Sequence, residues 1–355
     1  MRVVISGATG LIGTALTEHL RTQGHQVVRL VRGTAEASDV QWDPAAGMLP
    51  AGALDGADAV VNLAGAGIGD HRWTDEYRAT LRDSRLRSTT LLAERMAERG
   101  TAGDNPGVLI SASAIGYYGA RGDEELDEAS AGGDDFLATL CRDWEGATAP
   151  AAGAGARVAF LRTGIVLTPK GGALKKMLPL FKFGLGGRFG SGRQWQSWIT
   201  LADEVAAITH LLTADVEGPV NLTAPSPVTN REFTEVLGSV LHRPTFMTVP
   251  RFGPKLLLGG ELADALLFTG QRVLPRVLQD GGFQFQHPTL EVGLRAVLGR
   301  GRATARQRCR CAASGPARRR DPAARCRPCP ASRCGARPTS PRTRCRRGPW
   351  RRGSC

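Results

Sequence analysis

The chain has 355 residues and a hydrophobic content of 42%, enough for one large α/β domain or slightly more, and no apolar run of about 18 residues that could cross a membrane. Its formal net charge of +13 lies at one end: residues 301–355 hold 17 Arg, no Lys and one acid, a charge of +16, so residues 1–300 carry −3. Residues 1–300 contain one cysteine and no signal-peptide core, which is typical of a mildly acidic cytoplasmic protein and argues against a nucleic-acid or membrane partner for this part.

Strands and helices alternate through the first half of the chain. Apolar runs predict buried strands at 2–6, 26–32, 57–64, 108–114 and 157–167, with a short extended piece at 40–42. Helical patterning predicts helices at 11–20, 74–99 and 136–149. This alternation favours an α/β fold with a doubly wound parallel sheet, and we expect residues 1–167 to form a Rossmann-type NAD(P)-binding core.

The pattern changes after residue 167. Seven glycines between positions 171 and 192 interrupt a loop-rich stretch, and a helix (202–212), a strand (219–223) and a helix (230–241) follow. We expect residues 168–248 to mix a substrate lobe with elements that return to the sheet. Residues 249–299 should form a small, mainly helical C-terminal domain with a break at 281–283.

The end of the chain, residues 300–355, is rich in Arg, Pro and Cys and has no apolar periodicity, so we expect it to be disordered. Three interpretations compete. Its arginines favour phosphate and could bind nucleic acid. Cys326 and Cys329 could begin a zinc knuckle, although no second ligand pair has suitable spacing. Alternatively the segment has no selected function, since its composition is that of a GC-rich gene read in a shifted frame.

A glycine-rich turn, Gly-Ala-Thr-Gly-Leu-Ile-Gly at residues 7–13, follows the first strand and opens the first helix. Gly7 permits a tight turn, Gly10 lets the backbone approach a pyrophosphate, and Gly13 lets helix and strand pack closely. The helix N-terminus offers free N–H groups and the positive end of its dipole to phosphates. A glycine triplet in this context indicates a dinucleotide site rather than an ordinary turn.

The end of the second strand indicates which dinucleotide is bound. An acid there would bind the ribose 2′-hydroxyl of NAD, but the strand ends at Leu30, Val31 and Arg32, with Arg29 just before. A guanidinium at this place suits a 2′-phosphate and therefore favours NADP over NAD. The alternative is a solvated arginine at a strand end.

These residues, with Asn-Leu-Ala-Gly at 62–65, resemble the extended and atypical short-chain dehydrogenases/reductases. Further motifs resemble a subgroup described as epimerase family proteins, which are NAD(P)-dependent and similar to sugar epimerases. They are Ser-Ala-Ser-Ala-Ile-Gly-Tyr-Tyr-Gly at 111–119, Trp-Glu at 144–145, Leu-Arg-Thr-Gly-Ile-Val-Leu at 161–167, Gly-Ser-Gly-Arg-Gln-Trp at 190–195 and Gln-Arg-Val-Leu-Pro at 271–275. The resemblance covers about residues 1–299.

The resemblance implies a set of cofactor contacts. They are Thr9, Gly10, Leu11 and Ile12 at the pyrophosphate, Val31 and Arg32 at the adenosine end, Leu63 and Ala64 beside the adenine and ribose, Arg85 from the long helix, and Ile165 near the nicotinamide. Leu63, Ala64 and Ile165 are alternatively plain core residues, and Arg85 is alternatively part of a solvated helix face.

The acid/base pair of this superfamily is missing. Short-chain dehydrogenases use a Tyr as acid/base and a Lys four residues later that lowers its pKa. If Glu145 takes its family place, these positions fall on Leu137 and Cys141, and no lysine in residues 1–300 follows a tyrosine at that spacing. This departure puts epimerase or dehydratase activity in doubt.

Other polar residues near the expected nicotinamide are the remaining catalytic candidates. Ser113, or Ser111 if the register shifts, lies where the family places a substrate-binding hydroxyl, and Tyr117 and Tyr118 follow, with Arg162 as the cation that sequence order brings near them. Both tyrosines could equally be structural. The acids Glu124, Glu125, Asp127 and Glu128 read as a solvated loop.

Aromatic residues in the glycine-rich stretch are candidates for substrate contacts. Trp195, Gln196 and Trp198 could stack on a ring in the cleft or could pin the loop to the smaller lobe.

The main hypothesis is an NADP(H)-dependent epimerase or oxidoreductase acting on a nucleotide sugar or similar small molecule, with no bound metal. The alternatives are a catalytically weak cofactor-binding regulator, linked to cell division by family label, and nucleic-acid binding through the tail. The sequence names neither the substrate nor the oligomeric state.

Overall fold

The computed structural model describes residues 1–36 and 38–300. Within this part of the chain, seven strands form one parallel sheet in the order β12-β7-β5-β4-β1-β2-β3. They are β1 (Arg2–Ser6), β2 (Gln26–Val31), β3 (Asp39–Gln41), β4 (Ala59–Asn62), β5 (Val108–Ala114), β7 (Arg157–Thr163) and β12 (Gly218–Leu222). The strand order reverses at β1, so the carboxyl ends of β1 and β4 border the crevice where doubly wound sheets bind ligands. The predicted Rossmann fold is confirmed.

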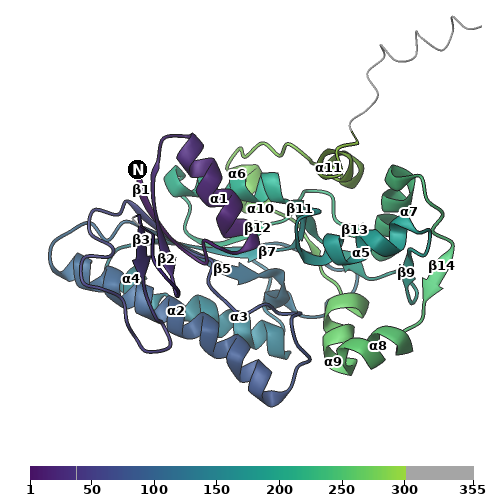
Figure 1. Cartoon of the computed structure of the whole chain (residues 1–355), viewed down its shortest axis with the longest axis horizontal. Coiled ribbons are helices and arrows are strands. Elements are labelled where there is room, and N and C mark those ends of the chain that lie inside the picture. Colours follow the sequence, from purple (N-terminus) through teal and green to yellow (C-terminus); the bar gives the residue numbers. More distant parts are fainter. Residues whose placement is uncertain (37, 301–355) are drawn as a thin grey trace, which may run out of the picture. The chain divides into compact units, whose positions relative to one another are not determined.

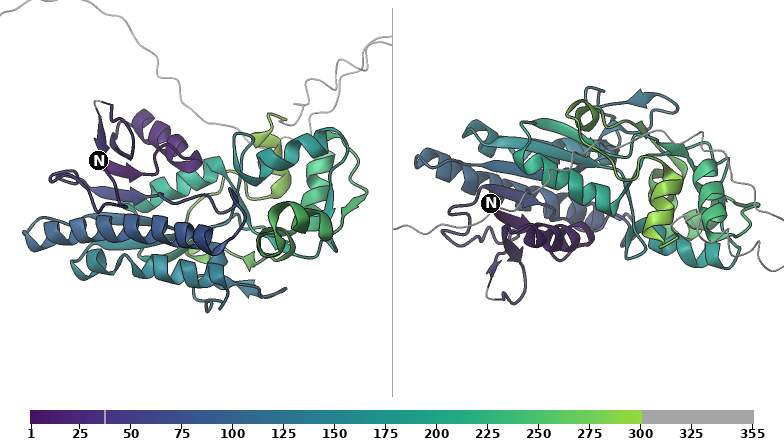
Figure 2. Two further views of the ribbon diagram at one scale, coloured as in Figure 1. Left: turned by 60° about the horizontal axis from the view of Figure 1, so that its bottom comes forward. Right: turned by 90° about the horizontal axis from the view of Figure 1, so that it is seen from above.

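Helices cover both faces of the sheet (Figures 1 and 2). α1 (Leu11–Thr22) and α6 (Leu201–Thr213) lie on one face, and α2 (Asp75–Thr101), α3 (Phe136–Gly146) and α4 (Ala149–Gly153) lie on the other. Successive side chains of a strand point to opposite faces of the sheet. Val3 and Ile5 of β1 therefore pack toward α1 and α6, and Val4 packs toward α2. This burial on both faces explains why the strands read as continuous apolar runs.

A smaller lobe, built from segments on either side of α6 and β12, has its own apolar core. It contains α5 (Gly172–Lys182), β9 (Gly187–Phe189), β10 (Trp195–Gln196), β13 (Val228–Thr229), α7 (Asn230–Leu241), β14 (Met247–Val249) and α11 (Leu290–Val297). Leu174 and Leu178 of α5 pack with Phe233 and Leu237 of α7 and with Leu294 of α11. β10 pairs with β13, and β9 pairs with β14, which holds the glycine-rich loop between them.

The structure corrects three expectations about elements. The expected strand 157–167 is two strands, β7 and β8 (Ile165–Leu167), because the chain leaves the large sheet at Gly164 to pair β8 with β11 (Trp198–Thr200). A Cβ on Gly164 would lie 2.5 Å from the Ser197 carbonyl oxygen, so the close approach there requires glycine. The helix expected at 136–149 ends at Gly146.

The third correction concerns the C-terminal segment. It holds α8 (Phe252–Leu258), α9 (Gly260–Ala263), a π-helical turn (Asp264–Phe268), α10 (Arg276–Asp280) and α11, but also β14 and β15 (Arg272–Val273). β15 pairs with β6 (Glu125–Leu126), which ties this segment to the loop after β5. Among the described residues no helix is long and apolar enough to cross a membrane. The expectations for the arginine-rich tail lie outside the described residues.

Candidate cofactor and catalytic site

The loop between β1 and α1 is built for a close approach of backbone. Gly7 adopts a φ of +66°, and a Cβ there would lie 2.5 Å from the Leu63 carbonyl oxygen. A Cβ on Gly13 would collide with the Gly7 carbonyl oxygen, so α1 can pack this tightly against β1 because position 13 is glycine.

The N-terminus of α1 has no side-chain cap. The helices α2, α3, α6 and α7 each begin with a Thr or Asp whose side chain accepts a backbone N–H of the first turn. α1 begins instead at Gly10, with no side-chain cap and no acid in its first turn, and Thr9 and Gly10 are exposed. The free N–H groups and the dipole leave a place for an anion, which fits the pyrophosphate of a dinucleotide.

The two arginines at the end of β2 differ in their surroundings. Arg29 forms ion pairs with Asp39 at 2.7 Å and Glu36 at 2.8 Å, and its hydrogen bond to Asp39 lowers the pKa of that carboxyl. Arg32 is exposed and makes no ion pair with any residue that the structure describes. Because Ser6 of β1 lies opposite Leu30 of β2, the backbone at Arg32, just after β2, lies at the same end of the sheet as the α1 loop. Of the two, Arg32 is thus the arginine whose guanidinium is not engaged by an acid within the described residues.

The remaining predicted cofactor residues lie along the same edge of the sheet. Leu63 and Ala64 follow β4 and are half-buried, and Ile165 begins β8. Arg85 turns inward from α2: its guanidinium carbon lies 5.0 Å from the Trp144 ring centroid, and Nη1 donates to the Leu81 carbonyl at 3.0 Å. Burial lowers the pKa of Arg85. Arg85 is thus not on a solvated helix face, although its contact with a cofactor remains a prediction.

A buried ion pair lies at the carboxyl ends of β5 and β7. Arg162 Nε and Nη2 each donate to the Glu145 carboxylate at 2.9 Å, and the side chains are 4% and 10% exposed. Ser113 Oγ donates to the same carboxylate at 2.7 Å. Both oxygens of Glu145 are therefore occupied by donors from two adjacent strands, which fixes the Ser113 hydroxyl in one orientation.

The two predicted tyrosines contact the same arginine but differ in access. Tyr118 is fully buried; its hydroxyl donates to Asn221 Oδ1 at 2.7 Å and accepts from Arg162 Nη1 at 3.1 Å. Burial raises the pKa of Tyr118 to about 12, although Arg162 opposes the shift. Tyr117 is half-buried, and its ring centroid lies 3.4 Å from the Arg162 guanidinium carbon. Arg162 therefore lies beside both tyrosines, as sequence order predicted, but desolvation outweighs the nearby cation at Tyr118 and its pKa stays raised.

The positions of the missing Tyr–Lys pair are filled by groups that cannot replace it. Leu137 faces the turn after β5, with its Cβ 3.2 Å from the point where Gly116 would carry one. The Cys141 thiol lies 3.6 Å from the Ala114 carbonyl oxygen, and burial raises its pKa to about 11. Cys141 is therefore a neutral thiol near pH 7.

The predicted substrate residues fall into two groups. Trp195 and Gln196 are half-buried in β10; Trp195 Nε1 donates to Asp123 Oδ1 at 2.7 Å, and Arg272 stacks on its ring at 4.5 Å. Trp198 is fully buried in the core of the smaller lobe, with Nε1 donating to the Ser226 carbonyl at 3.0 Å. A ring with no exposed surface cannot stack on a ligand, so we correct the assignment of Trp198 to that of a core residue.

Sequence reasoning missed part of this network. Glu145 was noted as a motif residue but not as the partner of Arg162. Glu128 was expected in a solvated loop, but it accepts the backbone N–H groups of Asn221 at 3.0 Å and Val277 at 3.3 Å, and burial raises its pKa. The sequence did contain a signal for the Arg162–Glu145 pair. Arg162 lies inside an apolar strand, and a buried charge requires a partner.

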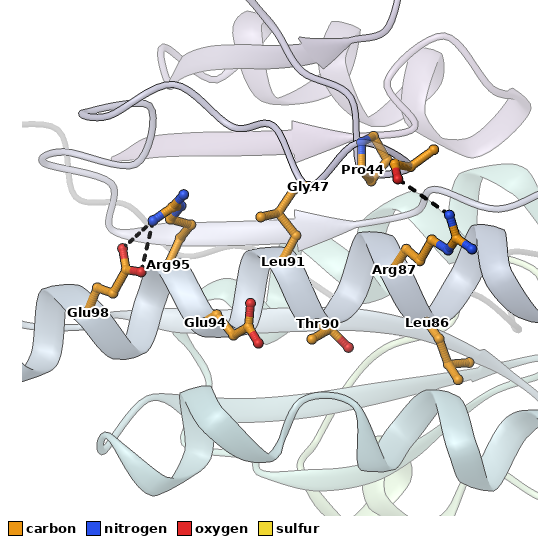
Figure 3. A pocket seen from close by; sticks show the side chains of 10 residues that line it. Pro44, Gly47, Leu86, Arg87, Thr90, Leu91, Glu94, Arg95 and Glu98 are labelled. Atoms are coloured by element: carbon orange, nitrogen blue, oxygen red, sulfur yellow. Dashed lines mark hydrogen bonds and ion pairs between the residues drawn. The ribbon is translucent and has the colours of Figure 1, made fainter.

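A groove of about 470 Å³ lies away from this site, between α2 and the turn at residues 44–47 (Figure 3). Figure 3 shows that its two arginines have partners: Arg95 pairs with Glu98 at 2.7 Å, and Arg87 donates to the Ala45 carbonyl at 3.3 Å. None of the predicted cofactor or catalytic residues lines it. The groove therefore adds nothing to the site at the sheet edge.

The fold, the uncapped loop of α1 and the polar edge of the sheet define a dinucleotide-binding Rossmann protein. The sequence matches the model of the NAD dependent epimerase/dehydratase family over residues 3–223, more than half of the chain, and a domain of unknown function (DUF1731) over residues 249–297. The chain belongs to the NAD dependent epimerase/dehydratase family.

Relatives extend over the same part of the chain. "Epimerase family protein Mb2239" of Mycobacterium bovis is 47% identical over 290 residues, 81% of this chain and 94% of the relative. The crystal structure of human epimerase family protein SDR39U1 (isoform 2) with NADPH is 36% identical with a TM-score of 0.77, covering 84% of this chain and 99% of that one. A nucleoside-diphosphate sugar epimerase from Corynebacterium glutamicum is 39% identical with a TM-score of 0.68, covering 84% and 58%. The expected resemblance is confirmed.

Proposed function

We propose that the chain is an NADP(H)-binding enzyme of the epimerase or oxidoreductase type, acting on a nucleotide sugar or a similar small molecule. The observation that carries the proposal is the uncapped, exposed N-terminus of α1 at the end of the sheet where the exposed Arg32 follows β2, with no ion pair to any described residue. Together they offer one place for a pyrophosphate and another for a 2′-phosphate. The human relative solved with NADPH and the bacterial relative described as a nucleoside-diphosphate sugar epimerase support the cofactor and the substrate class.

The predicted cofactor residues have distinct tasks in this proposal. A bound NADP(H) would supply hydride transfer. Thr9, Gly10, Leu11 and Ile12 would hold the pyrophosphate through backbone N–H groups, and Gly7 and Gly13 would shape the loop. Val31 and Arg32 would hold the adenosine phosphate, and Leu63, Ala64 and Ile165 would line the cofactor along the sheet edge. Arg85 lies close to Gly65, where a cation would offset negative charge of the cofactor.

Proton movement must use groups other than a Tyr–Lys pair. Ser113 donates its proton to Glu145, so its oxygen is left to accept a hydrogen bond from a substrate hydroxyl. Glu145, held by Arg162, accepts that hydrogen bond and so orients the Ser113 hydroxyl. Tyr117 stays the second candidate, because its hydroxyl has no hydrogen-bond partner among the described residues. We assign Tyr118 a positioning role, since both of its hydrogen bonds are used.

Single-turnover kinetics with NADPH and a panel of nucleoside-diphosphate sugars and ketones tests this proposal. We expect slow turnover that falls about 10²-fold or more in Ser113→Ala or Tyr117→Phe, the effect of losing a positioned proton-transfer group. Ser239→Ala, an exposed serine on α7, is the matched control and should retain parent activity. Turnover that survives both changes but is lost in Cys141→Ala would show that the site is misplaced.

One observation favours a second function. Leu137 and Cys141 leave the usual acid/base positions without a titratable group near neutral pH. A protein with this site could bind the cofactor as a regulator with little turnover. Tight NADPH binding without oxidation or reduction of any panel member would favour that function over catalysis.

A further inference from the structure

The loop between β4 and α2, residues 63–74, is joined to the smaller lobe. The Gly69 carbonyl accepts a hydrogen bond from Lys176 Nζ of α5 at 3.3 Å, and Arg72 Nη2 donates to the Leu256 carbonyl of α8 at 2.6 Å. Because this loop follows β4, it borders the crevice where doubly wound sheets bind their ligands. The β4–α2 loop therefore connects the sheet to the smaller lobe at that crevice.

The first turn of α2 adds a third connection to the smaller lobe. Arg78 forms an ion pair with Glu261 of α9. The β4–α2 loop is tied to this turn, because the Tyr77 hydroxyl donates to the Gly67 carbonyl at 2.5 Å. All three connections to the smaller lobe therefore hold one unit, the loop and the start of α2.

Helix α5 also contacts the other side of the crevice. A Cβ on Gly171, just before α5, would lie 2.9 Å from Leu11 Cδ1, so the start of α5 lies against the first residue of α1. Lys176 lies about one turn further along α5. At the base of the loop, a Cβ on Gly7 would collide with the Leu63 carbonyl. The α1 loop, α5 and the β4–α2 loop therefore form a closed chain of contacts beside the uncapped N-terminus of α1.

This closed chain has one firm side and one weak side. Gly7 and Leu63 directly follow β1 and β4, which are paired in the sheet, so their contact cannot open while the sheet is intact. The connections to the lobe instead use exposed side chains, among them Lys176, Arg72 and Glu261. Exposed charged contacts contribute little free energy and are easily broken. The β4–α2 loop can therefore open on the side of the smaller lobe.

We propose that the β4–α2 loop is a latch over the bound dinucleotide, held closed by Lys176, Arg72 and Glu261, and that its opening limits how fast NADP(H) enters and leaves. This inference rests on the proposed function. A dinucleotide with its pyrophosphate at the α1 N-terminus, crossing the ends of β1 and β4, would pass between the loop and α5. Opening and closing of such a loop can limit the rate of binding and release.

A latch and a direct cofactor contact have different kinetic effects. The latch contacts join residues of the chain to one another, so weakening them speeds binding and release together. Loss of a side chain that touches the cofactor speeds release alone and weakens affinity. Stopped-flow fluorescence of NADPH binding, and of NADPH displacement by excess NADP⁺, measures both rates on the full chain.

The test variant is Lys176→Met/Glu261→Gln, which breaks two of the three connections. We expect NADPH to bind and dissociate about fivefold faster than in the parent, with Kd unchanged within about twofold, the effect of losing exposed charged contacts. The control is Lys175→Met/Glu235→Gln, which makes the same charge changes on α5 and α7. Both control side chains are exposed and have no hydrogen bond or ion pair with any described residue, so the control should keep the parent rates.

Rates in the test variant equal to those of the control would overturn the latch. Faster release at an unchanged binding rate would also overturn it, because Lys176 would then be a cofactor ligand. If the double variant does not fold, each of its single substitutions supports the same comparison with the matching single control.

Amide hydrogen exchange of residues 65–74 tests the latch without cofactor. We expect exchange in the NADPH-free protein to be faster in Lys176→Met/Glu261→Gln than in the control, because local opening becomes easier. Equal exchange in the two variants would show that these contacts do not hold the loop. Failure of the parent to bind NADPH would instead contradict the proposed function, whereas the exchange experiment reports on the loop alone.

Discussion

At the scale of single residues, Arg162 illustrates how a buried charge is kept in this fold. Its guanidinium is 4% exposed and is satisfied by Glu145, the Tyr118 hydroxyl and the Tyr117 ring. Removing one member leaves an uncompensated buried charge, which is far more costly than losing a surface pair.

We therefore predict that Glu145→Ala lowers the free energy of unfolding by about 3–5 kcal/mol, measured by urea denaturation. The control is Glu291→Ala, which breaks the exposed pair with Arg295 and should cost less than about 1 kcal/mol. Similar small losses in both variants would contradict the view that Glu145 neutralises Arg162.

Glu204 predicts a pH dependence of stability. It is fully buried on α6, Thr163 Oγ1 donates to its Oε1 at 2.9 Å, and its Oε2 has no partner in the part of the chain that the structure describes. Burial raises its pKa from the ordinary 4.5 to about 8. The folded state thus holds a proton that the unfolded chain releases. The contribution of Glu204 to the free energy of unfolding is therefore fully present below about pH 4.5 and is lost as the pH rises to about 8.

Glu204→Gln removes this titration and keeps the shape of the protonated acid. We expect the variant to gain stability over the parent as the pH rises from 5 to 8, by on the order of a few kcal/mol. Thermal unfolding of both proteins across that pH range measures the difference. Curves that stay parallel would show that Glu204 is already ionised in the folded protein.

Sequence reasoning worked best for geometry that depends on local sequence. The tight turn at Gly7, the close packing at Gly13 and the position of Arg32 just after β2 are as expected, while their contacts with a cofactor stay predictions. Glu128 and Trp198 were misjudged because their burial depends on segments far away in sequence: Glu128 is covered by residues near 221 and 277, and Trp198 by α11.

At the scale of elements, the joint between β1 and α1 is where packing and binding meet. A Cβ on Gly13 would collide with the Gly7 carbonyl, so α1 would have to move and displace the loop. We predict that Gly13→Ala lowers thermal stability and weakens NADPH binding about tenfold or more, the loss typical of a displaced charge-assisted contact. Calorimetry and a melting curve measure the two effects.

Gly146→Ala is the control for that substitution, because a Cβ there meets nothing within 4 Å. It should leave NADPH binding unchanged and leave stability unchanged or up to about 1 kcal/mol higher. NADPH affinity in Gly13→Ala equal to that of this control would contradict the close packing of α1 on β1.

Element types were predicted well where patterns were long and periodic. The parallel strands and the helices α1, α2, α6 and α7 follow from apolar spacing, and the limits differ by a few residues. The break at Gly164 and the strands β14 and β15 could not be predicted, because each depends on a distant pairing partner such as Ser197, β9 or β6.

At the scale of the whole molecule, residues 1–300 form closed apolar cores around the sheet and in the smaller lobe. The sequence after residue 300 has no periodic apolar face to add to them. We predict that truncation after Gly299 leaves the melting temperature and NADPH affinity unchanged, measured by calorimetry. A fall of several degrees in the melting temperature would show that the removed residues stabilise the fold.

The central claim is that this Rossmann protein binds NADP(H) through the α1 loop and Arg32. The most direct test is calorimetric titration of the parent protein and Arg32→Ala with NADPH and with NADH. We predict tighter binding of NADPH by the parent, and loss of about 10- to 150-fold of that preference in Arg32→Ala, the value of a charge-assisted phosphate contact. Equal affinities for NADPH and NADH in the parent would contradict the claim.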